Sequence, residues 1–512
     1  MRQGRQGTQG GGWHRTKIVC TLGPATDSPG VIEGLIGAGM DVARINASHG
    51  DHADHARRIE QVRRAARDSG QPVAILVDLP GPKFRLGNLQ DGCCKLVEGA
   101  SVTLVEEGHV AEEGREQEEG SIVLPVRNPE LLQALRVGER VFLADGSVEI
   151  KVRIAAAGYA GRVQCGVLIG GAVRSGSGIN LPELALNELV PTEDDRRHLT
   201  FAISQEVEWV GVSFVQSAGD LARVRALLPA GSLPLLMAKI EKRRALANLD
   251  EIVEAADGVM VARGDLGVET DLAEIPIMQK RIIAAANAQA RPVVTATQML
   301  ESMVEHEHPT RAEVTDVANA VLDGTDAVML SAETAIGQFP IAAARILQRV
   351  LAATEAEYVM PGCSVPAYGG RKIDRMHSAA QSSMRISTTG SIEDAISFAA
   401  CQLATRTGAS AIVVSVRSMA AAMEIARFRP QVPLVMITDS VQLYRSLALV
   451  HGVAPLFSPE SGIGEPQPHI AQAREWLLAQ GLAQPSDQAV LLSASTMVGD
   501  KADTLQIVRL DG

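Results

Sequence analysis

The chain has 512 residues, more than a single hydrophobic core usually organises, so its length predicts two to four domains. Its formal net charge of -12 and its pI near 5.5 argue against nucleic acid or an anionic membrane as a partner, because either would need a basic face. No run of about 18 apolar residues occurs, so we expect a soluble protein without a membrane-spanning helix.

The N-terminal residues 1–12 are mainly Gln, Gly and Arg and lack the apolar core of a secretory signal, which predicts a disordered tail. The six cysteines lack the paired spacing of a zinc site or a redox dithiol: Cys20, Cys93, Cys94, Cys165, Cys363 and Cys401. Scattered thiols of this kind are typical of a reducing compartment, so we expect a cytoplasmic protein.

Eight short apolar segments, separated mostly by stretches of helical periodicity, predict the strands of one domain. They are Lys17–Cys20, Asp41–Ile45, Val73–Val77, Trp209–Val212, Leu235–Ile240, Gly258–Val261, Pro292–Ala296 and Ala327–Leu330. Because these segments are apolar throughout, the strands should be buried on both faces, which favours a closed parallel (β/α)₈ barrel over an open sheet. We assign residues 13–82 and 183–353 to this barrel.

The regular spacing is interrupted between the third and fourth strands by residues 83–182, where Val and Gly alternate. This pattern predicts an inserted β domain, which we call the lid. Residues 354–390 are rich in Gly, Ser and Pro and predict a linker. In residues 391–512 helical stretches alternate again with short strands, which predicts a smaller, open α/β domain.

Polar residues at the ends of the strands are the candidate site, because catalytic groups of such a barrel lie where its strands end. The fifth strand ends in Lys239 and Glu241, whose side chains project to the same side because they are two residues apart. Polar residues follow other strands too: Arg44, Asn46, Ser48 and His49 the second, Asp78 and Arg85 the third, Asp265 the sixth and Thr297 the seventh. We expect these side chains to meet at the barrel mouth.

Each of these residues also has a purely structural explanation. A Lys-x-Glu pair on a strand is more often a surface ion pair, Asp265 could cap a helix, and His49 could be an ordinary loop residue. Lys239 and Glu241 differ because they follow the apolar run 235–238, which should lie in the barrel wall. Charges buried there are costly unless a metal or a substrate pairs with them.

The combination of residues limits the reaction. Glu241 and Asp265, on neighbouring strands, suit a hard divalent cation such as Mg²⁺ or Mn²⁺. Arg44 and Arg85 supply planar guanidinium groups for a phosphate, and Lys239 supplies a point charge for a group in transit. Phosphoryl transfer needs little more, because its catalysis is mostly positioning and charge neutralisation. The chain has no Gly-x-x-x-x-Gly-Lys loop, so it is not a P-loop kinase.

Seven segments closely resemble pyruvate kinases. They are residues 16–25 (TKIVCTLGPA), 42–50 (VARINASHG), 260–267 (MVARGDLG), 296–303 (ATQMLESM), 309–313 (PTRAE), 316–324 (DVANAVLDG) and 329–334 (MLSAET). The matches cover nearly the whole barrel in order, whereas the lid and the C-terminal domain match only in outline. The resemblance implies a glycolytic enzyme that transfers the phosphoryl group of phosphoenolpyruvate to ADP, giving pyruvate and ATP.

The resemblance also implies a role for each candidate residue. Glu241 and Asp265 would hold Mg²⁺ or Mn²⁺, and Lys239 would stabilise the phosphoryl group in flight. Backbone N–H groups of Gly264 and Asp265 would bind the substrate carboxylate, and Thr297 would assist protonation of the enolate.

The remaining candidates would surround the phosphate and the nucleotide. Their implied partners are the phosphate for Arg44 and Arg85, the nucleotide for Arg85, His49 and Asn46, and a monovalent cation for Asn46, Ser48 and Asp78. The lid would close over ADP and exclude water. The family's usual assembly implies a homotetramer.

Three departures from the family pattern carry predictions. Ser177 stands at a lid position where the family commonly has lysine, which would weaken closure over the nucleotide. Lys83 replaces the glutamate of potassium-dependent members; unless it is only a solvated hinge lysine, its ammonium supplies the same charge, so K⁺ should not be required. Residues 416–422 carry Val, Met and Ala in place of the hydroxyl groups and glycine of sugar-phosphate-activated members. Fructose 1,6-bisphosphate should therefore not activate this protein.

Two alternatives stay open at this point. A metal-dependent aldolase or lyase acting on pyruvate in a similar barrel would explain the carboxylate pair, but not Arg44, Arg85 and a lid of nucleotide size. A non-catalytic, metabolite-binding paralogue would be expected to have lost Lys239, Asp265 or Thr297, and all three are present.

Overall fold

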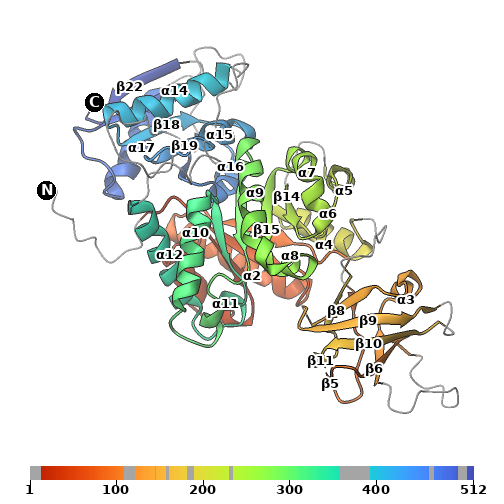
Figure 1. Cartoon of the computed structure of the whole chain (residues 1–512). Coiled ribbons are helices and arrows are strands. Elements are labelled where there is room, and N and C mark those ends of the chain that lie inside the picture. Colours follow the sequence, from red (N-terminus) through yellow and green to blue (C-terminus); the bar gives the residue numbers. More distant parts are fainter. Residues whose placement is uncertain are drawn as a thin grey trace.

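A computed structural model describes residues 13–82, 84–108, 122–144, 146–156, 161–181, 190–229, 234–357, 392–459, 466–493 and 504–511. The expected N-terminal tail, Lys83 and residues 358–390 of the expected linker lie outside these described residues. Figure 1 shows a barrel in the middle of the molecule, with a unit of β strands on one side and a C-terminal α/β unit on the other. The predicted fold class is confirmed.

Eight parallel strands close the barrel in the order β1-β17-β16-β15-β14-β13-β3-β2. Their bounds are β1 Lys17–Leu22, β2 Val42–Asn46, β3 Ala74–Asp78, β13 Trp209–Val212, β14 Leu235–Ile240, β15 Gly258–Ala262, β16 Val293–Ala296 and β17 Ala327–Leu330. Every predicted strand is found within two residues of its expected ends, because short apolar runs bounded by polar residues suit strands buried on both faces.

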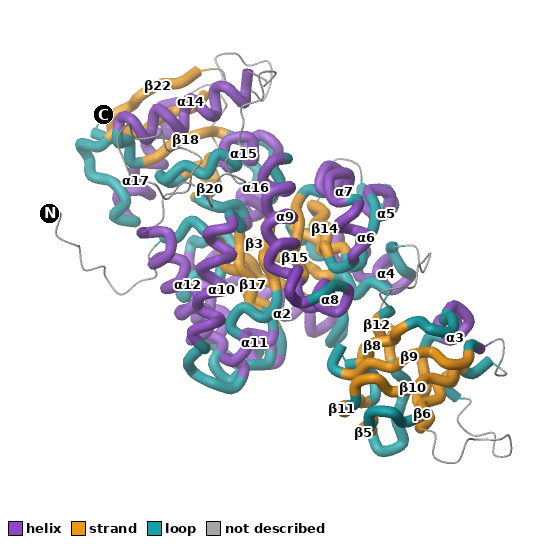
Figure 2. The backbone as a smooth tube through the Cα atoms, in the orientation of Figure 1, coloured by secondary structure: helices purple, strands orange, loops and turns teal. Residues whose placement is uncertain are grey.

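Helices surround these strands (Figure 2) and pack their apolar sides on the outside of the barrel. They are α1 Val31–Gly37, α2 His52–Ser69, α4 Glu193–Ser204, α5 Ala218–Arg225, α6 Arg243–Ala247, α7 Leu249–Ala255, α8 Arg263–Glu269, α9 Ile275–Ala288, α10 Arg311–Asp323, α11 Ala332–Ala335 and α12 Pro340–Glu357. In the part of the chain that is described, no helix is both long and apolar enough to cross a bilayer.

Alternate residues of the strands fill the inside of the barrel with a second, separate apolar cluster. Its members come from all eight strands: Val19, Val42, Ala74, Leu76, Trp209, Met237, Met260, Val294, Ala296, Ala327 and Met329. Because strand side chains alternate between two sides, this cluster identifies which residues of each strand point inward.

The lid is inserted between β3 and β13 and is built mostly from antiparallel strands. Its main sheet runs in the order β4-β12-β8-β9-β10-β6-β7, and a bridge between Leu86 and Val126 brings its two edges together into a nearly closed barrel. The elements are β4 Phe84–Arg85, β5 Cys93–Leu96, β6 Ser101–Glu106, β7 Ile122–Val126, α3 Pro129–Ala134, β8 Arg140–Leu143, β9 Val148–Ile154, β10 Val163–Ile169, β11 Gly171–Arg174 and β12 Gly178–Asn180. Since the lid leaves the chain where β3 ends, it stands beside the mouth of the barrel.

The C-terminal unit is an open five-stranded sheet in the order β20-β19-β18-β21-β22, in which only β22 is antiparallel to its neighbour. Its elements are α14 Ile392–Thr407, β18 Ala411–Ser415, α15 Met419–Ala426, β19 Leu434–Thr438, α16 Val441–Ser446, β20 Val453–Phe457, α17 Pro466–Ala479, β21 Gln488–Ser493 and β22 Thr504–Arg509.

The floor of the barrel, where the strands begin, is joined to this C-terminal unit. Arg429 Nη2 lies 3.0 Å from Asp326 Oδ2, just before β17, and both residues are buried. The indole N–H of Trp209, at the start of β13, donates to the carbonyl oxygen of Ser446 at 3.4 Å. The floor is therefore covered, and the mouth at the other end of the strands lies on the side of the lid.

Candidate active site

A layer of charged residues lies at the barrel mouth, next to the apolar interior. On β14, Met237 belongs to the interior cluster, so Lys239, two residues further along, also points inward. The same alternation on β2 and β3 turns Arg44 and Asp78 inward, and Glu241 follows directly after β14. Relative exposure is 9% for Arg44, 1% for Asp78, 7% for Lys239 and 1% for Glu241. Charges buried to this degree must be paired.

The pairing alternates in sign. Arg44 Nη2 lies 2.6 Å from Asp78 Oδ2, and Lys239 Nζ lies 3.1 Å from Asp78 Oδ1. Lys239 Nζ also lies 2.7 Å from Glu241 Oε1 and donates to Ser213 Oγ at 2.7 Å. Two cations and two carboxylates therefore form one compensated cluster, which we call the mouth cluster (Arg44, Asp78, Lys239 and Glu241).

The charges of the mouth cluster shift each other's pKa values. Burial would lower the pKa of Lys239, but the carboxylates of Asp78, Glu241 and Asp265 outweigh it and raise this pKa above its ordinary value. Burial would raise the pKa of Asp78, but Lys239 and Arg44 outweigh it and lower this pKa. Lys239 and Asp78 are therefore both ionised at neutral pH. Asp265, in the first turn of α8, is thus near enough to contribute to the pKa of Lys239.

Glu241 and Asp265 fit the requirements of a divalent cation. Glu241 Oε2 accepts the backbone N–H of Phe214 at 2.9 Å, which fixes the carboxylate. Asp265 lies in the first turn of α8 and is half-buried. Carboxylate oxygens are the donors that Mg²⁺ and Mn²⁺ prefer. Within the described ranges no group of three or more His, Cys, Asp or Glu side chains could hold a metal, so an ion here would need further oxygens from water or a ligand.

Thr297 lies directly after β16 in an uncommon backbone conformation. Its φ is 65° and that of Gln298 is 56°, so two successive residues occupy the left-handed region, which a β-branched residue rarely adopts. The Thr297 hydroxyl accepts the backbone N–H of Gly264 at 2.9 Å and donates to the carbonyl oxygen of Ala296 at 2.7 Å. The predicted pair Gly264 and Thr297 is thus in direct contact.

Four other predicted residues make local contacts. Arg85 lies in β4 of the lid, where its Nη1 donates to the carbonyl oxygen of Gly176 at 3.0 Å. Asn46 neighbours Asp78 across the β2–β3 pair, and its Oδ1 accepts the N–H of Ser48 at 3.1 Å. The N–H of His49 donates to the carbonyl oxygen of Asn46 at 3.3 Å. None of these contacts of Arg85, Asn46 and Ser48 involves Lys239.

Some residues of the site could not be assigned to it from the sequence. Thr21 Oγ1 accepts from Arg44 Nη1 at 3.0 Å, and a Thr on a strand carries no signal of this contact. Phe214, whose φ is 59°, is an aromatic residue that serves the site through its backbone N–H. Asp316 on α10 lies 2.7 Å from Arg263 Nη1, a contact across 53 residues of sequence. Ser213, which directly follows β13 and accepts from Lys239, is by contrast a polar residue at a strand end, which the sequence does indicate.

The segment 416–422 of the C-terminal unit includes the start of α15. Ser418 caps α15, and its side-chain oxygen accepts the N–H of Ala421 at 3.2 Å. The hollow beside it, lined in part by Val416, Arg417 and Thr438, leaves no room for a water molecule.

Known proteins match this chain over most of its length. The family model described as pyruvate kinase, barrel domain, matches residues 13–344, and the one described as pyruvate kinase, alpha/beta domain, matches residues 394–508. A pyruvate kinase of Geobacillus stearothermophilus is 38% identical over 499 residues, covering 96% of this chain and 79% of the relative. Pyruvate kinase 2 of Synechocystis is 41% identical over 446 residues, covering 86% and 70%. A pyruvate kinase of Methylorubrum extorquens is 36% identical over 479 residues, covering 94% of both chains.

Proposed function

Because this chain belongs to the pyruvate kinase family, and so transfers the phosphoryl group of phosphoenolpyruvate to ADP, we propose that the mouth cluster is where this transfer takes place. The family and the reaction predicted from the sequence are confirmed by matches over nearly the whole chain, which sets the lyase and the non-catalytic alternatives aside. The observation that carries the proposal is the buried ammonium of Lys239, held between Asp78 and Glu241.

Lys239 stabilises the phosphoryl group as it moves. A phosphoryl group in transfer carries negative charge on its oxygens, and a preorganised cation in a site of low dielectric stabilises that charge strongly. Asp78 and Glu241 support this role, because their carboxylates keep Lys239 protonated. Arg44 and Arg85 bind the phosphate oxygens, for which a planar guanidinium group is well suited.

Glu241 and Asp265 hold the divalent cation that the family generally uses, Mg²⁺ or Mn²⁺, which when bound supplies positive charge against the substrate's carboxylate and phosphate oxygens. The backbone N–H groups of Gly264 and Asp265 bind the substrate carboxylate. After transfer, Thr297 directs a proton to C3 of the enolate; the electron pair of the C2–C3 double bond forms the new C–H bond, and C2–O becomes the carbonyl of pyruvate.

Residues at the edge of the site are assigned to nucleotide binding and to ion dependence. We assign the nucleotide to His49, Asn46 and Arg85, beneath the lid. Asn46, Ser48 and Asp78 are the ligands of a monovalent cation, if one binds. K⁺ is not required, because Lys83 supplies the equivalent charge; in support, Asp78 already contacts two cations of the protein.

The protein is further assigned to the cytoplasm as a homotetramer, with a barrel of residues 13–82 and 183–353, a lid of residues 83–182, a linker of residues 354–390 and a C-terminal domain of residues 391–512. The homotetramer is carried over from the usual assembly of the family. Sedimentation velocity tests the assembly; a monomer at micromolar concentration would contradict it.

The reaction itself is tested by coupling pyruvate to the oxidation of NADH by lactate dehydrogenase, with phosphoenolpyruvate, Mg²⁺ and either ADP or no nucleotide. We expect pyruvate to form only with ADP and to be matched by an equal amount of ATP. Equal pyruvate formation in both reactions would indicate hydrolysis and would refute the proposal.

A further inference from the structure

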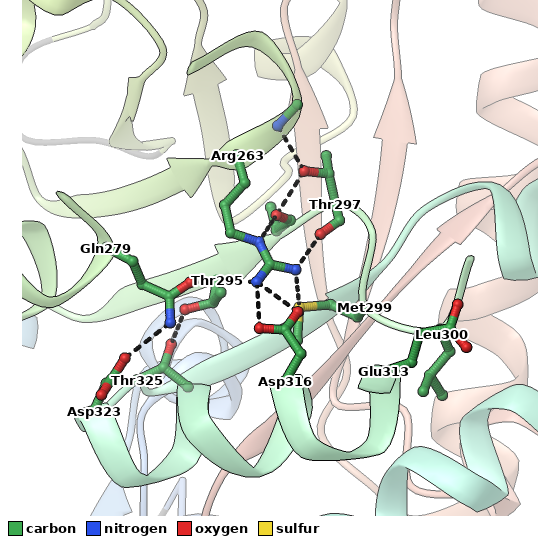
Figure 3. Close-up of polar contacts among 12 residues, drawn as sticks. Arg263, Gln279, Thr295, Thr297, Met299, Leu300, Glu313, Asp316, Asp323 and Thr325 are labelled. Carbon is green, nitrogen blue, oxygen red and sulfur yellow. Dashed lines mark hydrogen bonds and ion pairs between the residues drawn. The ribbon is translucent and has the colours of Figure 1, made fainter. Parts of the chain in front are cut away.

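Arg263, at the junction of β15 and α8, is held by contacts on every side of its guanidinium group (Figure 3). Nη2 donates to the carbonyl oxygen of Thr297 at 2.5 Å, and Nε donates to the carbonyl oxygen of Ala296 at 3.3 Å. Nη1 donates to both carboxylate oxygens of Asp316 on α10, at 2.9 and 2.7 Å. One side chain, 8% exposed, therefore connects the ends of β15 and β16 to α10.

The contacts of Arg263 fall on the strained part of the backbone. Thr297 and Gln298 both have positive φ values, and such a conformation persists only where the surroundings over-determine it. Arg263 binds the carbonyl groups on both sides of the Thr297 Cα atom, those of Ala296 and of Thr297 itself. The next residue along from Arg263, Gly264, binds the Thr297 hydroxyl. The β15–α8 junction thus fixes both the backbone and the hydroxyl of Thr297.

Asp316 completes the arrangement. It neutralises the buried guanidinium group and accepts from Nη1 with both oxygens, which leaves Nε and Nη2 to bind the carbonyl oxygens of Ala296 and Thr297. The side chain of Asp316 is 36% exposed, and its place on α10 leaves it outside the mouth cluster. Among the described residues its side chain binds Arg263, so its effect on the site passes through that guanidinium group.

We propose that Arg263, oriented by Asp316, is a positioning residue for the proton-transfer step: it holds Thr297 where its hydroxyl reaches C3 of the enolate. The inference rests on the function proposed above for Thr297. Phosphoryl transfer should depend on this arrangement less, because Thr297 serves the proton-transfer step and the hydrogen bonds described for Arg263 go to β16 and α10. Asp265, two residues after Arg263, gives phosphoryl transfer a weaker dependence on the same junction. Loosening Arg263 should therefore slow protonation more than phosphoryl transfer.

The test separates the two steps. Removal of a proton from C3 of pyruvate is the reverse of enolate protonation, and NMR follows it as exchange of the methyl protons in D₂O with Mg²⁺ and ATP present. Phosphoryl transfer is measured as ATP formed from phosphoenolpyruvate and ADP. For Arg263→Lys, which keeps the charge but loses the planar fork, we expect exchange to fall at least tenfold and ATP formation to fall less than threefold. Asp316→Asn should show the same pattern to a smaller extent.

Arg291→Lys is the matched control. Arg291 precedes β16 at the other end of the strand and also donates to backbone carbonyl groups, those of Val253 and Glu254. It should leave both rates within twofold of wild type.

When Asp316→Asn is combined with Arg263→Lys, it should lower the exchange rate by almost no further factor, because Asp316 acts through Arg263. If exchange and ATP formation fall by the same factor, or if exchange is unchanged in Asp316→Asn, Arg263 is only a structural residue and the inference is wrong. If the wild-type protein forms no ATP from phosphoenolpyruvate, the proposed function itself fails. That outcome is distinct from any change in the ratio of exchange to ATP formation among the variants.

Discussion

We predict that His55, beside the mouth of the barrel, makes the stability of the fold sensitive to acid. It lies in the first turn of α2, shortly after the strand that carries Arg44, and is 2% exposed. Within the described residues neither ring nitrogen has a hydrogen-bond partner, and the ring lies 6.2 Å from that of Phe201 on α4. Burial, assisted by the nearby charge of Arg58, lowers the pKa of His55 to about 4. The ring is therefore neutral in the folded protein at neutral pH.

The size of the effect follows from proton linkage. Between pH 6.5 and about 4 the unfolded chain binds a proton at His55 that the folded chain does not bind, so stability falls as the pH falls through this window. Above pH 6.5 His55 has almost no effect on the free energy of unfolding, and below about pH 4 the loss of stability that it causes is complete. At pH 5.0 the difference amounts to about 2 kcal/mol, an upper limit because solvent screening would reduce it.

The assay is urea unfolding of the wild type and of His55→Leu at pH 7.5, 6.5, 5.5 and 5.0. Leucine cannot bind the proton. As the pH falls from 7.5 to 5.0, the free energy of unfolding of the variant should therefore rise by up to about 2 kcal/mol relative to that of the wild type. His308→Leu, at an exposed position, is the control and should show no such gain. A constant difference between wild type and His55→Leu across this range would refute the reasoning.

Three further predictions concern catalysis and its control. Lys239→Met should lower kcat by about 10²-fold or more with KM nearly unchanged, because the lost charge matters mainly in the transition state; Lys280→Met, which removes an ion-paired lysine from α9, is the control. A raised KM with unchanged kcat would show that Lys239 only binds substrate. Activity in Mg²⁺ buffer with tetramethylammonium in place of K⁺ should be retained, and Lys83→Glu should create a need for K⁺; a wild type that is nearly inactive until K⁺ is added would contradict this. Fructose 1,6-bisphosphate should not shift the saturation curve for phosphoenolpyruvate, because Val416, Met419 and Ala421 stand in place of the hydroxyl groups and glycine that would hold a phosphate; a clear leftward shift would overturn the prediction.

The barrel and the mouth cluster could be predicted because they depend on local regularities of the sequence. Eight apolar runs specify eight buried strands, and their spacing specifies the helices between them. Lys239 and Glu241 are two residues apart on one such run, so the alternation of the strand alone brings them together. Arg44 and Asp78 follow by the same rule on β2 and β3. The sequence therefore predicts which charged side chains face inward, but not which of them pair with each other.

The remaining features depend on contacts that no local pattern encodes. Arg263 and Asp316 both belong to recognisable segments, but they lie on different helices, and no local pattern of the sequence shows that they pair. The left-handed conformation of Thr297 is imposed by such distant contacts rather than by its own preference. The pair of Arg429 with Asp326 likewise joins residues 103 positions apart. Packing of separate elements decides these positions, and only the folded chain reveals them.

The buried joint at the barrel floor limits how this protein can be divided. A truncation after α12 would remove Arg429, the counter-ion of Asp326, and would also remove Ala448 and Leu449, which pack against the apolar side chains inside the barrel. The same cut would deprive the indole of Trp209 of its acceptor, the carbonyl oxygen of Ser446. The chain reads as a catalytic barrel with an appended module, yet the barrel cannot serve as a minimal enzyme without redesign of its floor. A shortened enzyme would need polar residues in place of the apolar side chains that the deletion exposes at the floor.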